Sequence, residues 1–384
     1  MTKYYMSKFL SRRNYGFFIV LFTIIATVNA QNYPEQVNLD NVNFNSYQSP
    51  SQTFPDYLQP FTESISGNTV MRISDQNVLG TSSQRLRHNY SVDQPWNSDG
   101  SLIKLAGYPA AILDGDTYEF LYWSNIPSYG RWSNTQPNII YGTAGNKFVS
   151  HNVQTNQTTT LHTFSGFSSV NFGNGEGTQD NNDKYVGLIG NNNTLIVYDI
   201  ELDQVVGTKS IPNGDLDWFS VSANGGYAVA SWRNNGTGNT QGLKRFNIDL
   251  TNETHIYDYT EHGDFGIDAN GNEVFVQYGD EDTWDQEYYL VMIRLDNAQV
   301  TPLFHWPQSL HGSSGIWGGH VSCRNNARPG WAYISEGCCT SHPVASREIF
   351  AIKLDGSNTI ERYAKHNSDY GSGYGHESHA VPNR

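Results

Sequence analysis

Short apolar runs separated by turn-forming residues follow one another along most of this 384-residue chain. Stretches such as PWNSDGSLIKLA, VSANGGYAVAS and GIDANGNEVFVQYG each place a turn rich in Asp, Asn or Gly before an apolar or alternating run. That order is the sequence signal of a β-hairpin. The units recur about every 40 to 55 residues, a period that fits a repeat of four strands.

A second pattern follows each of these hairpins. Segments such as NTLIVYDIELDQVVGTKSI, GLKRFNIDLTNETHIYDY and REIFAIKLDGSNTIERYAKH pair an apolar strand ending near Asp or Asn with a turn and another strand. One sheet cannot bury so many short strands, whereas small twisted sheets stacked around an axis cover one another's apolar faces. We therefore expect an all-β fold, a β-propeller of six or seven blades, over residues 81–384.

The last residues bear on the blade count. The segment HESHAVPNR occupies the same phase of the repeat as GGHVSCRNNARPG, so it is predicted to be the innermost strand of a further blade. This favours a seven-bladed propeller with four-stranded blades, the last of them truncated at its first turn. Two alternatives are a terminal tail, or closure of the ring by an upstream segment such as NTVMRIS, residues 68–74, because propellers avoid open strand edges.

The first thirty residues have the features of a signal peptide. Lys8, Arg12 and Arg13 precede the apolar run GFFIVLFTIIATV, and small residues before Gln31 suit cleavage. We expect a secreted or periplasmic protein with no membrane insertion after signal cleavage; an uncleaved anchor is the alternative. Residues 31–80, rich in Gln, Asn, Ser and Pro, are expected to form an extended lead-in that packs along the propeller or covers its channel.

Composition narrows the partners. The formal charge of −14 and the 16% share of charged residues disfavour nucleic acid and anionic membranes, which need a Lys and Arg footprint. The cysteines Cys323, Cys338 and Cys339 lie in one region, and export would allow a disulfide from Cys323 to either of the others. Three cysteines exclude a four-cysteine metal site.

Histidines recur just before the predicted inner strands. Side chains at this phase converge on the axis of a propeller, and His262, His320 and His379 occupy it. Imidazoles that face one channel form a potential site for a divalent metal such as Mn, Ca or Zn. Each could instead hydrogen-bond the backbone of a neighbouring blade. Glu377 and Asp264 are expected to support the site rather than to bind metal.

Arg87, His88 and Tyr90 place a cation, a base and a phenol within four positions. Together with His262 they suit β-elimination from a uronate, in which the carboxylate is neutralised, a base removes the proton on the adjacent carbon, and an acid protonates the leaving oxygen. The candidate substrate-binding residues are Arg131, Trp132, Arg233 and Trp317. The alternatives are a solvated charge for each Arg and an inter-blade core position for each Trp.

The repeated strand pattern, the turns NSDG, SANG and DANG, the histidines before inner strands and the terminal HESHAVP resemble exported β-propeller lyases. The likeness is to oligogalacturonate lyases and, more loosely, to propeller-type ulvan lyases. The resemblance implies that His320, His376 and His379 bind a divalent metal beside the channel mouth. It departs from the family pattern at the end of the chain, where Glu377 and Ser378 separate the last two histidines.

Two functions follow as hypotheses. The first is an exported polysaccharide lyase that cleaves a uronic-acid-containing glycan by β-elimination at the mouth of the channel, with an anionic polysaccharide or oligosaccharide as its partner. The second is a non-catalytic propeller that binds a glycan or a protein. The inner-strand histidines favour the first hypothesis, and the net acidity favours the second.

Overall fold

The computed structural model describes residues 55–63, 67–81, 86–212, 215–279, 288–306, 319–335, 348–366 and 377–383. The predicted signal peptide, residues 1–30, lies outside these ranges, as does much of the predicted lead-in. Among the residues that the structure describes, no helix has the length and apolar character needed to cross a bilayer.

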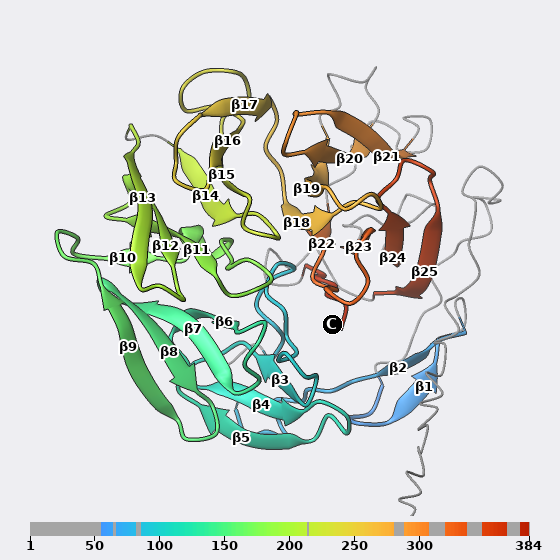
Figure 1. Ribbon diagram of the computed structural model, residues 1–384. Helices are drawn as coiled ribbons and strands as arrows, with labels where there is room; N and C mark the ends of the chain where they lie inside the picture. Colours follow the sequence, from blue (N-terminus) through green and yellow to red (C-terminus); the bar gives the residue numbers. More distant parts are fainter. Residues whose placement is uncertain are drawn as a thin grey trace, which may run out of the picture. The chain divides into compact units, whose positions relative to one another are not determined.

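Six antiparallel sheets follow one another in chain order around a common centre (Figure 1). The first contains β3 (Leu102–Leu105), β4 (Ala110–Asp114) and β5 (Phe120–Ser124), with an isolated bridge from Trp96 to Ile103 at its inner edge. The second contains β6 (Ser128–Trp132), β7 (Ile139–Ala144), β8 (Lys147–Asn152) and β9 (Gln157–Thr163). The third contains β10 (Val170–Asn171), β11 (Tyr185–Gly190), β12 (Thr194–Asp199) and β13 (Gln204–Ser210), with a 3-10 turn at Gly173–Gly175.

The remaining three sheets have the same order of strands. The fourth contains β14 (Leu216–Val221), β15 (Tyr227–Trp232), β16 (Leu243–Asn247) and β17 (Thr254–Tyr257). The fifth contains β18 (Gly263–Ile267), β19 (Glu273–Tyr278), β20 (Tyr288–Arg294) and β21 (Val300–Trp306). The sixth contains β22 (His320–Ser322), β23 (Trp331–Ser335), β24 (Glu348–Lys353) and β25 (Ile360–Lys365). The predicted β-propeller is confirmed.

The core lies between blades. Val276 and Leu290 of the fifth sheet share one apolar cluster with Val321 and Ile334 of the sixth. The middle strands are apolar on both faces because each blade is covered by a neighbour on either side, which removes the strict alternation expected of a half-exposed sheet. Burial therefore joins successive blades into one stack.

The predicted seventh blade is wrong: the described residues form six. Residues 377–383 contain no strand. They are attached to the sixth blade through a side chain, since Ser335 Oγ donates to the carbonyl of Ser378 at 2.8 Å and accepts from the amide of Ala380 at 3.1 Å. The position of this segment in the sequence repeat correctly indicated that it lies near the inner strands. It is held there by side-chain hydrogen bonds and not by backbone pairing with a strand.

An upstream hairpin touches both the first and the last blade. It pairs β1 (Pro60–Thr62) with β2 (Thr69–Met71). Asn68, next to β2, donates a 2.6 Å hydrogen bond to the carbonyl of Tyr363 in β25 of the sixth blade. Ile73, just past β2, packs against the apolar cluster of the first blade. This is the segment considered for ring closure from the sequence.

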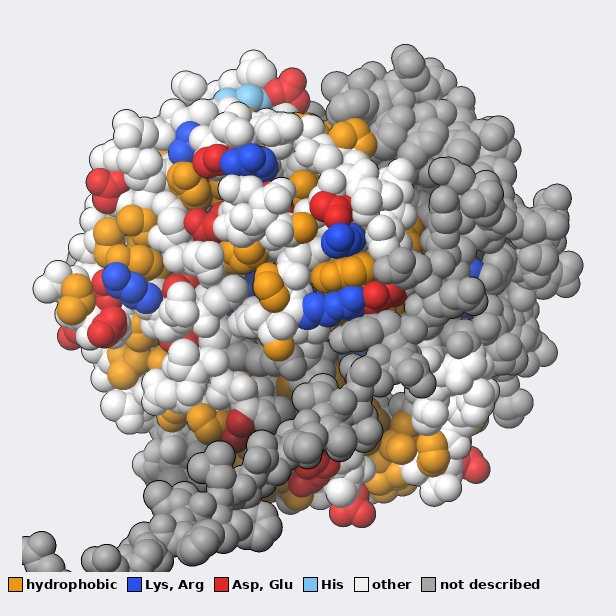
Figure 2. Space-filling model, turned by 45° about the vertical axis from the view of Figure 1, so that its right-hand side comes forward, with side chains coloured by type: hydrophobic (Ala, Val, Ile, Leu, Met, Phe, Trp, Pro, Cys, Tyr) orange, Lys and Arg blue, Asp and Glu red, His pale blue; other side chains and the backbone are white. Residues whose placement is uncertain are grey.

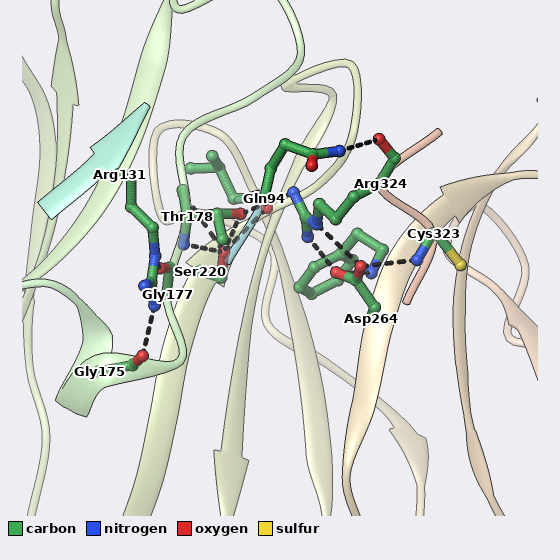
Figure 3. A network of polar contacts seen from close by, with 11 residues as sticks. Gln94, Arg131, Gly175, Gly177, Thr178, Ser220, Asp264, Cys323 and Arg324 are labelled. Atoms are coloured by element: carbon green, nitrogen blue, oxygen red, sulfur yellow. Dashed lines mark hydrogen bonds and ion pairs between the residues drawn. The ribbon is translucent and has the colours of Figure 1, made fainter. Parts of the chain in front are cut away.

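An ion pair on the axis joins the fifth and sixth blades (Figure 3). The Asp264 carboxylate is fully buried and accepts from both Nε (2.8 Å) and Nη2 of Arg324. The backbone amides of Phe265 and Cys323 donate to the same carboxylate, each at 2.8 Å. Four donors offset the cost of burying this charge.

Further polar contacts extend this network to the other blades. Gln94, just before the first blade, donates to the carbonyls of Arg324 at 3.0 Å and Pro382 at 2.9 Å. The amide of Thr178, at the inner edge of the third blade, donates to Ser220 Oγ of the fourth blade at 3.0 Å. Figure 3 shows these side chains converging between the inner strands.

Cys323 is a free cysteine in this structure, and its side chain packs against the core of the last two blades. Burial raises the pKa of its thiol, with a further contribution from Asp264. Its predicted disulfide partners, Cys338 and Cys339, lie outside the described residues.

We expect Arg324→Ala to lower the free energy of unfolding by about 3–5 kcal/mol, because Asp264 would keep a buried and unpaired charge. Lys353→Ala is the matched control, since Lys353 pairs with Asp355 at the surface with 40% of its side chain exposed and such pairs contribute about 0–1 kcal/mol. Denaturant unfolding followed by tryptophan fluorescence measures both. Equal losses in the two variants would contradict a central role for the axial ion pair.

Candidate active site

Four imidazoles and one phenol meet at the axis. The ring of Tyr90 lies 5.1 Å from that of His320, 4.9 Å from that of His379 and 6.0 Å from that of His262. The His320 and His379 rings are 4.0 Å apart, and His262 lies 4.8 Å from His320. The ring of His88 lies 6.3 Å from that of His379. The predicted convergence of distant histidines is therefore present in the structure.

The propeller topology explains this convergence. His262 directly precedes β18 and His320 is the first residue of β22, and both strands are innermost in their blades. Innermost strands of successive blades run in the same direction, so their first residues lie at one end of the channel. His88 and Tyr90 precede the inner edge of the first blade, and His379 comes from the terminal segment.

His320 has a defined tautomer. Its Nδ1 lies 3.2 Å from the carbonyl oxygen of Ser378, an atom that can only accept, so Nδ1 carries the proton. Nε2 is then a bare lone pair, buried and without a hydrogen-bond partner among the described residues. A backbone carbonyl that fixes the far nitrogen of an imidazole is typical of metal-binding histidines.

His320, Glu377 and His379 form a group whose ligand atoms all lie within 4.8 Å of one another. The Oε2 atom of Glu377 is 3.6 Å from Nε2 of His320 and 3.9 Å from Nε2 of His379. Two ligands at about 2.1 Å from a shared ion are at most about 4.2 Å apart, so both separations from Glu377 fit, and the group as a whole, within 4.8 Å, would contract slightly around an ion. Neither ring nitrogen of His379 has a hydrogen-bond partner within the described ranges. These residues fit a divalent metal.

Burial keeps His88, His320 and His379 neutral by lowering their pKa values. It lowers the pKa of His88 to about 4, and, with a contribution from His88, that of His379 to about 3. The pKa of His320 is lowered by burial and then by the neighbouring His379. Burial also raises the pKa of Glu377. A neutral imidazole is the form that binds metal or accepts a proton.

Tyr90 and His262 form a pair, with the phenol oxygen 2.5 Å from Nδ1 of His262. When Nδ1–H donates to the phenol oxygen, Nε2 of the half-buried His262 has a lone pair that can accept a proton. Arg87 supplies a cation beside the cluster and donates from Nη1 to the carbonyl of Glu377 at 2.9 Å. The structure thus brings together Arg87, His88, Tyr90 and His262, as predicted.

Two of the predicted substrate-binding residues are buried and therefore inaccessible to a ligand. Trp132 is 2% exposed, packs in the inter-blade core and donates from Nε1 to the carbonyl of Pro95 at 2.9 Å. Arg131 is 3% exposed, pairs with Asp93 at 3.1 Å and donates to the carbonyls of the Gly175–Gly177 turn. Trp132 therefore occupies the inter-blade core position that was its alternative. Arg131 forms an internal ion pair, which was neither the predicted sugar contact nor the alternative of a solvated charge.

Of the other predicted residues, Arg233 is exposed and its Nε lies 3.1 Å from Oδ1 of Asp217. It follows β15 directly and remains accessible to a ligand. Trp317 and His376 lie outside the described residues, so their predicted roles in sugar stacking and metal binding stay predictions.

The sequence interpretation missed Arg324 and the ion pair of Asp93 with Lys104, and it gave Glu377 only a supporting role. A signal for Arg324 was present. Asp264 comes two residues after His262, and Arg324 comes four residues after His320, each in or just after an inner strand. An opposite-charge pair at this spacing from the two histidines indicates the buried ion pair near the cluster.

Comparison of the sequence with known protein families and with characterised proteins finds no match. Solved structures do match the fold. The oligogalacturonate lyase of Vibrio parahaemolyticus superposes with a TM-score of 0.57 at 13% sequence identity, over 84% of this chain and 89% of the other. An oligogalacturonate lyase in complex with manganese gives a TM-score of 0.57 at 13% identity, over 83% and 86%. The predicted resemblance to oligogalacturonate lyases is confirmed at the level of the fold.

Proposed function

We propose that this chain is a polysaccharide lyase that cleaves a uronic-acid-containing glycan by β-elimination at the channel mouth. The observation that carries the proposal is the convergence of Tyr90, His262, His320 and His379 beside Arg87. One position thus offers a cation, a base and a metal-binding group, the three elements that elimination next to a carboxylate requires. The fold shared with oligogalacturonate lyases supports the same reaction class.

The metal site would use His320, His379 and Glu377. A divalent cation held there would polarise the substrate carboxylate and so acidify the proton on the adjacent ring carbon. The fold neighbour in complex with manganese makes that ion the first to test. Arg87 lies beside the same position and would bind the carboxylate from the other side.

His262 is the proposed base. Its Nδ1–H donates to the Tyr90 oxygen, which orients the ring and leaves the lone pair of Nε2 free for the substrate proton. As the C–H bond breaks, its electron pair forms the carbon–carbon double bond, and the bond to the leaving oxygen breaks. A water molecule would protonate that oxygen. His88 is buried next to His379 and would hold the His379 ring in place.

The proposal includes export. The apolar segment near the N-terminus supports a signal peptide, and a polymer substrate requires an extracellular or periplasmic enzyme. On the face in Figure 2, most Lys and Arg side chains lie beside Asp or Glu rather than in a basic patch. Recognition of an anionic glycan would therefore depend on the local cations of the site.

We expect the purified protein, supplied with manganese, to produce ultraviolet-absorbing unsaturated ends from a uronate polymer. His262→Ala should lower kcat by about 10²–10⁴-fold, because general-base catalysis contributes on that order. Tyr90→Phe should lower kcat by a smaller factor, roughly tenfold or more, since it removes only the hydrogen bond that orients His262. Absorbance during turnover measures all three proteins.

The matched control is His162→Ala, on β9, where His162 pairs with Asp203 at the surface at 2.7 Å. This variant should keep full activity. Absence of unsaturated product from a broad panel of uronate polymers, with and without divalent metal, would contradict the proposal and favour a non-catalytic glycan-binding propeller.

Metal binding provides a separate test. We expect the parent protein to retain about one manganese or zinc ion per chain after dialysis, and His320→Ala or His379→Ala to weaken the binding at least tenfold. Elemental analysis and calorimetric titration measure the stoichiometry and the affinity, with His162→Ala as the control. Equal metal content in all four proteins would rule out this group as the binding site.

A further inference from the structure

A cleft of about 670 Å³ lies between the first and second blades, next to the histidine cluster. It falls within the range of roughly 300–1,000 Å³ that is usual for small-molecule sites. Its lining includes Asn89, which stands between His88 and Tyr90 in the chain, so the cleft and the proposed active site share one loop. A glycan chain that leaves the active site on this side would enter the cleft.

Two tyrosines border the cleft with exposed rings. Tyr108, in the loop between β3 and β4, is 76% exposed, and Tyr129, in β6, is 48% exposed. They are the exposed aromatic side chains among the described residues. Aromatic rings are usually buried because of their large apolar area, so two exposed rings at one cleft indicate a surface that a ligand covers.

Tyr129 is held in place by its surroundings. Its backbone has a φ of 51°, in the left-handed region that non-glycine residues rarely adopt. Its ring lies directly against Gly175, where an added Cβ would come within 2.7 Å of Cε1 of the tyrosine. A strained backbone that presents an exposed ring is typical of a functional position.

Among the described residues that line the cleft, no Lys or Arg side chain is available to pair with a ligand. Asp93 and Lys104 are its charged lining residues, and both side chains are 2% exposed. Nζ of Lys104 is 3.0 Å from both carboxylate oxygens of Asp93, and the buried Arg131 pairs with the same carboxylate at 3.1 Å, so both cations are engaged below the surface of the cleft. The rest of the polar lining consists of amides and hydroxyls, from Asn89, Asn125, Ser128, Thr143 and Thr158. Such groups hydrogen-bond sugar hydroxyls but do not neutralise a carboxylate.

We propose that this cleft binds a neutral pyranose next to the uronate that is cleaved, with Tyr108 and Tyr129 stacking on its faces. Resting on the proposed lyase function, this makes the substrate a glycan in which uronate and neutral sugars alternate, rather than a homopolymer of uronate. The formal charge of −14 agrees, because an alternating glycan has a lower charge density and is repelled less.

The test is calorimetric binding of glycans to the full chain carrying His262→Ala, which leaves the ligand uncut. The probes are two matched pairs: a rhamnose–galacturonate alternating oligosaccharide against oligogalacturonate, and a rhamnose–glucuronate alternating oligosaccharide against oligoglucuronate. We expect one alternating probe to bind at least tenfold more tightly than its homopolymer. Tyr108→Ala or Tyr129→Ala should remove about tenfold of that affinity, equivalent to about 1.4 kcal/mol.

Two control variants accompany the test. Tyr108→Trp keeps an aromatic face and should keep the affinity, and Leu202→Ala removes an apolar side chain that is 60% exposed in the turn after β12 and should change nothing. Homopolymers that bind as tightly as alternating probes, tyrosine variants with unchanged affinity, or no binding of any probe would each overturn the inference.

The lyase assay on the parent protein separates the two proposals. Unsaturated product together with tyrosine-independent binding would overturn the neutral-sugar cleft and leave the lyase function in place. Tyrosine-dependent binding of an alternating probe without unsaturated product would support the cleft and overturn the elimination.

Discussion

The buried ion pair of Arg324 with Asp264 is the constraint on which the site depends. It lies on the axis, where it joins the fifth and sixth blades, and Gln94 extends its contacts to the first blade and the terminal segment. His262 and His320 lie two and four residues earlier in the chain than Asp264 and Arg324, at the start of the inner strands β18 and β22. The ion pair thus sets the separation of the two strands that begin at the imidazoles. A shift of the ion pair would move the metal-binding group and the proposed base together.

The fold was predictable because a propeller repeats one local pattern. Turn residues before apolar runs fixed the hairpins, and their period fixed the four-stranded blade. The blade count was not predictable, because the terminal segment has the sequence phase of an inner strand while Ser335 attaches it by side-chain hydrogen bonds. The repeat pattern predicts which face of a strand a side chain would lie on. It does not predict whether a neighbouring strand is there to pair with.

The same distinction applies to the site. The position of His262 and His320 before inner strands was enough to bring them together, since topology alone decides where such residues lie. The roles of Arg131 and Trp132 could not be predicted, because their burial depends on Asp93 and on the neighbouring blade. Side-chain type suggested ligand binding for both, and the partners that decide the matter are distant in the sequence.

The chemistry of the mouth divides into two parts. Arg87 and the group formed by His320, Glu377 and His379 suit a carboxylate, whereas the cleft between the first two blades has its charged side chains buried in ion pairs and is bordered by tyrosines. A surface with a net negative charge can bind an anionic glycan when its cations are concentrated where the reacting uronate lies. Specificity would then depend on the neighbouring sugar, through stacking and hydroxyl recognition rather than charge.

The most direct test of the central claim is the mass of the fragments released from a uronate-containing glycan. β-Elimination creates a non-reducing end that lacks one molecule of water relative to the hydrolysis product, because the double bond forms without addition of solvent. The account predicts fragments of this lower mass from the parent protein. Fragments that have gained water, or a glycan that is bound and left intact, would contradict it.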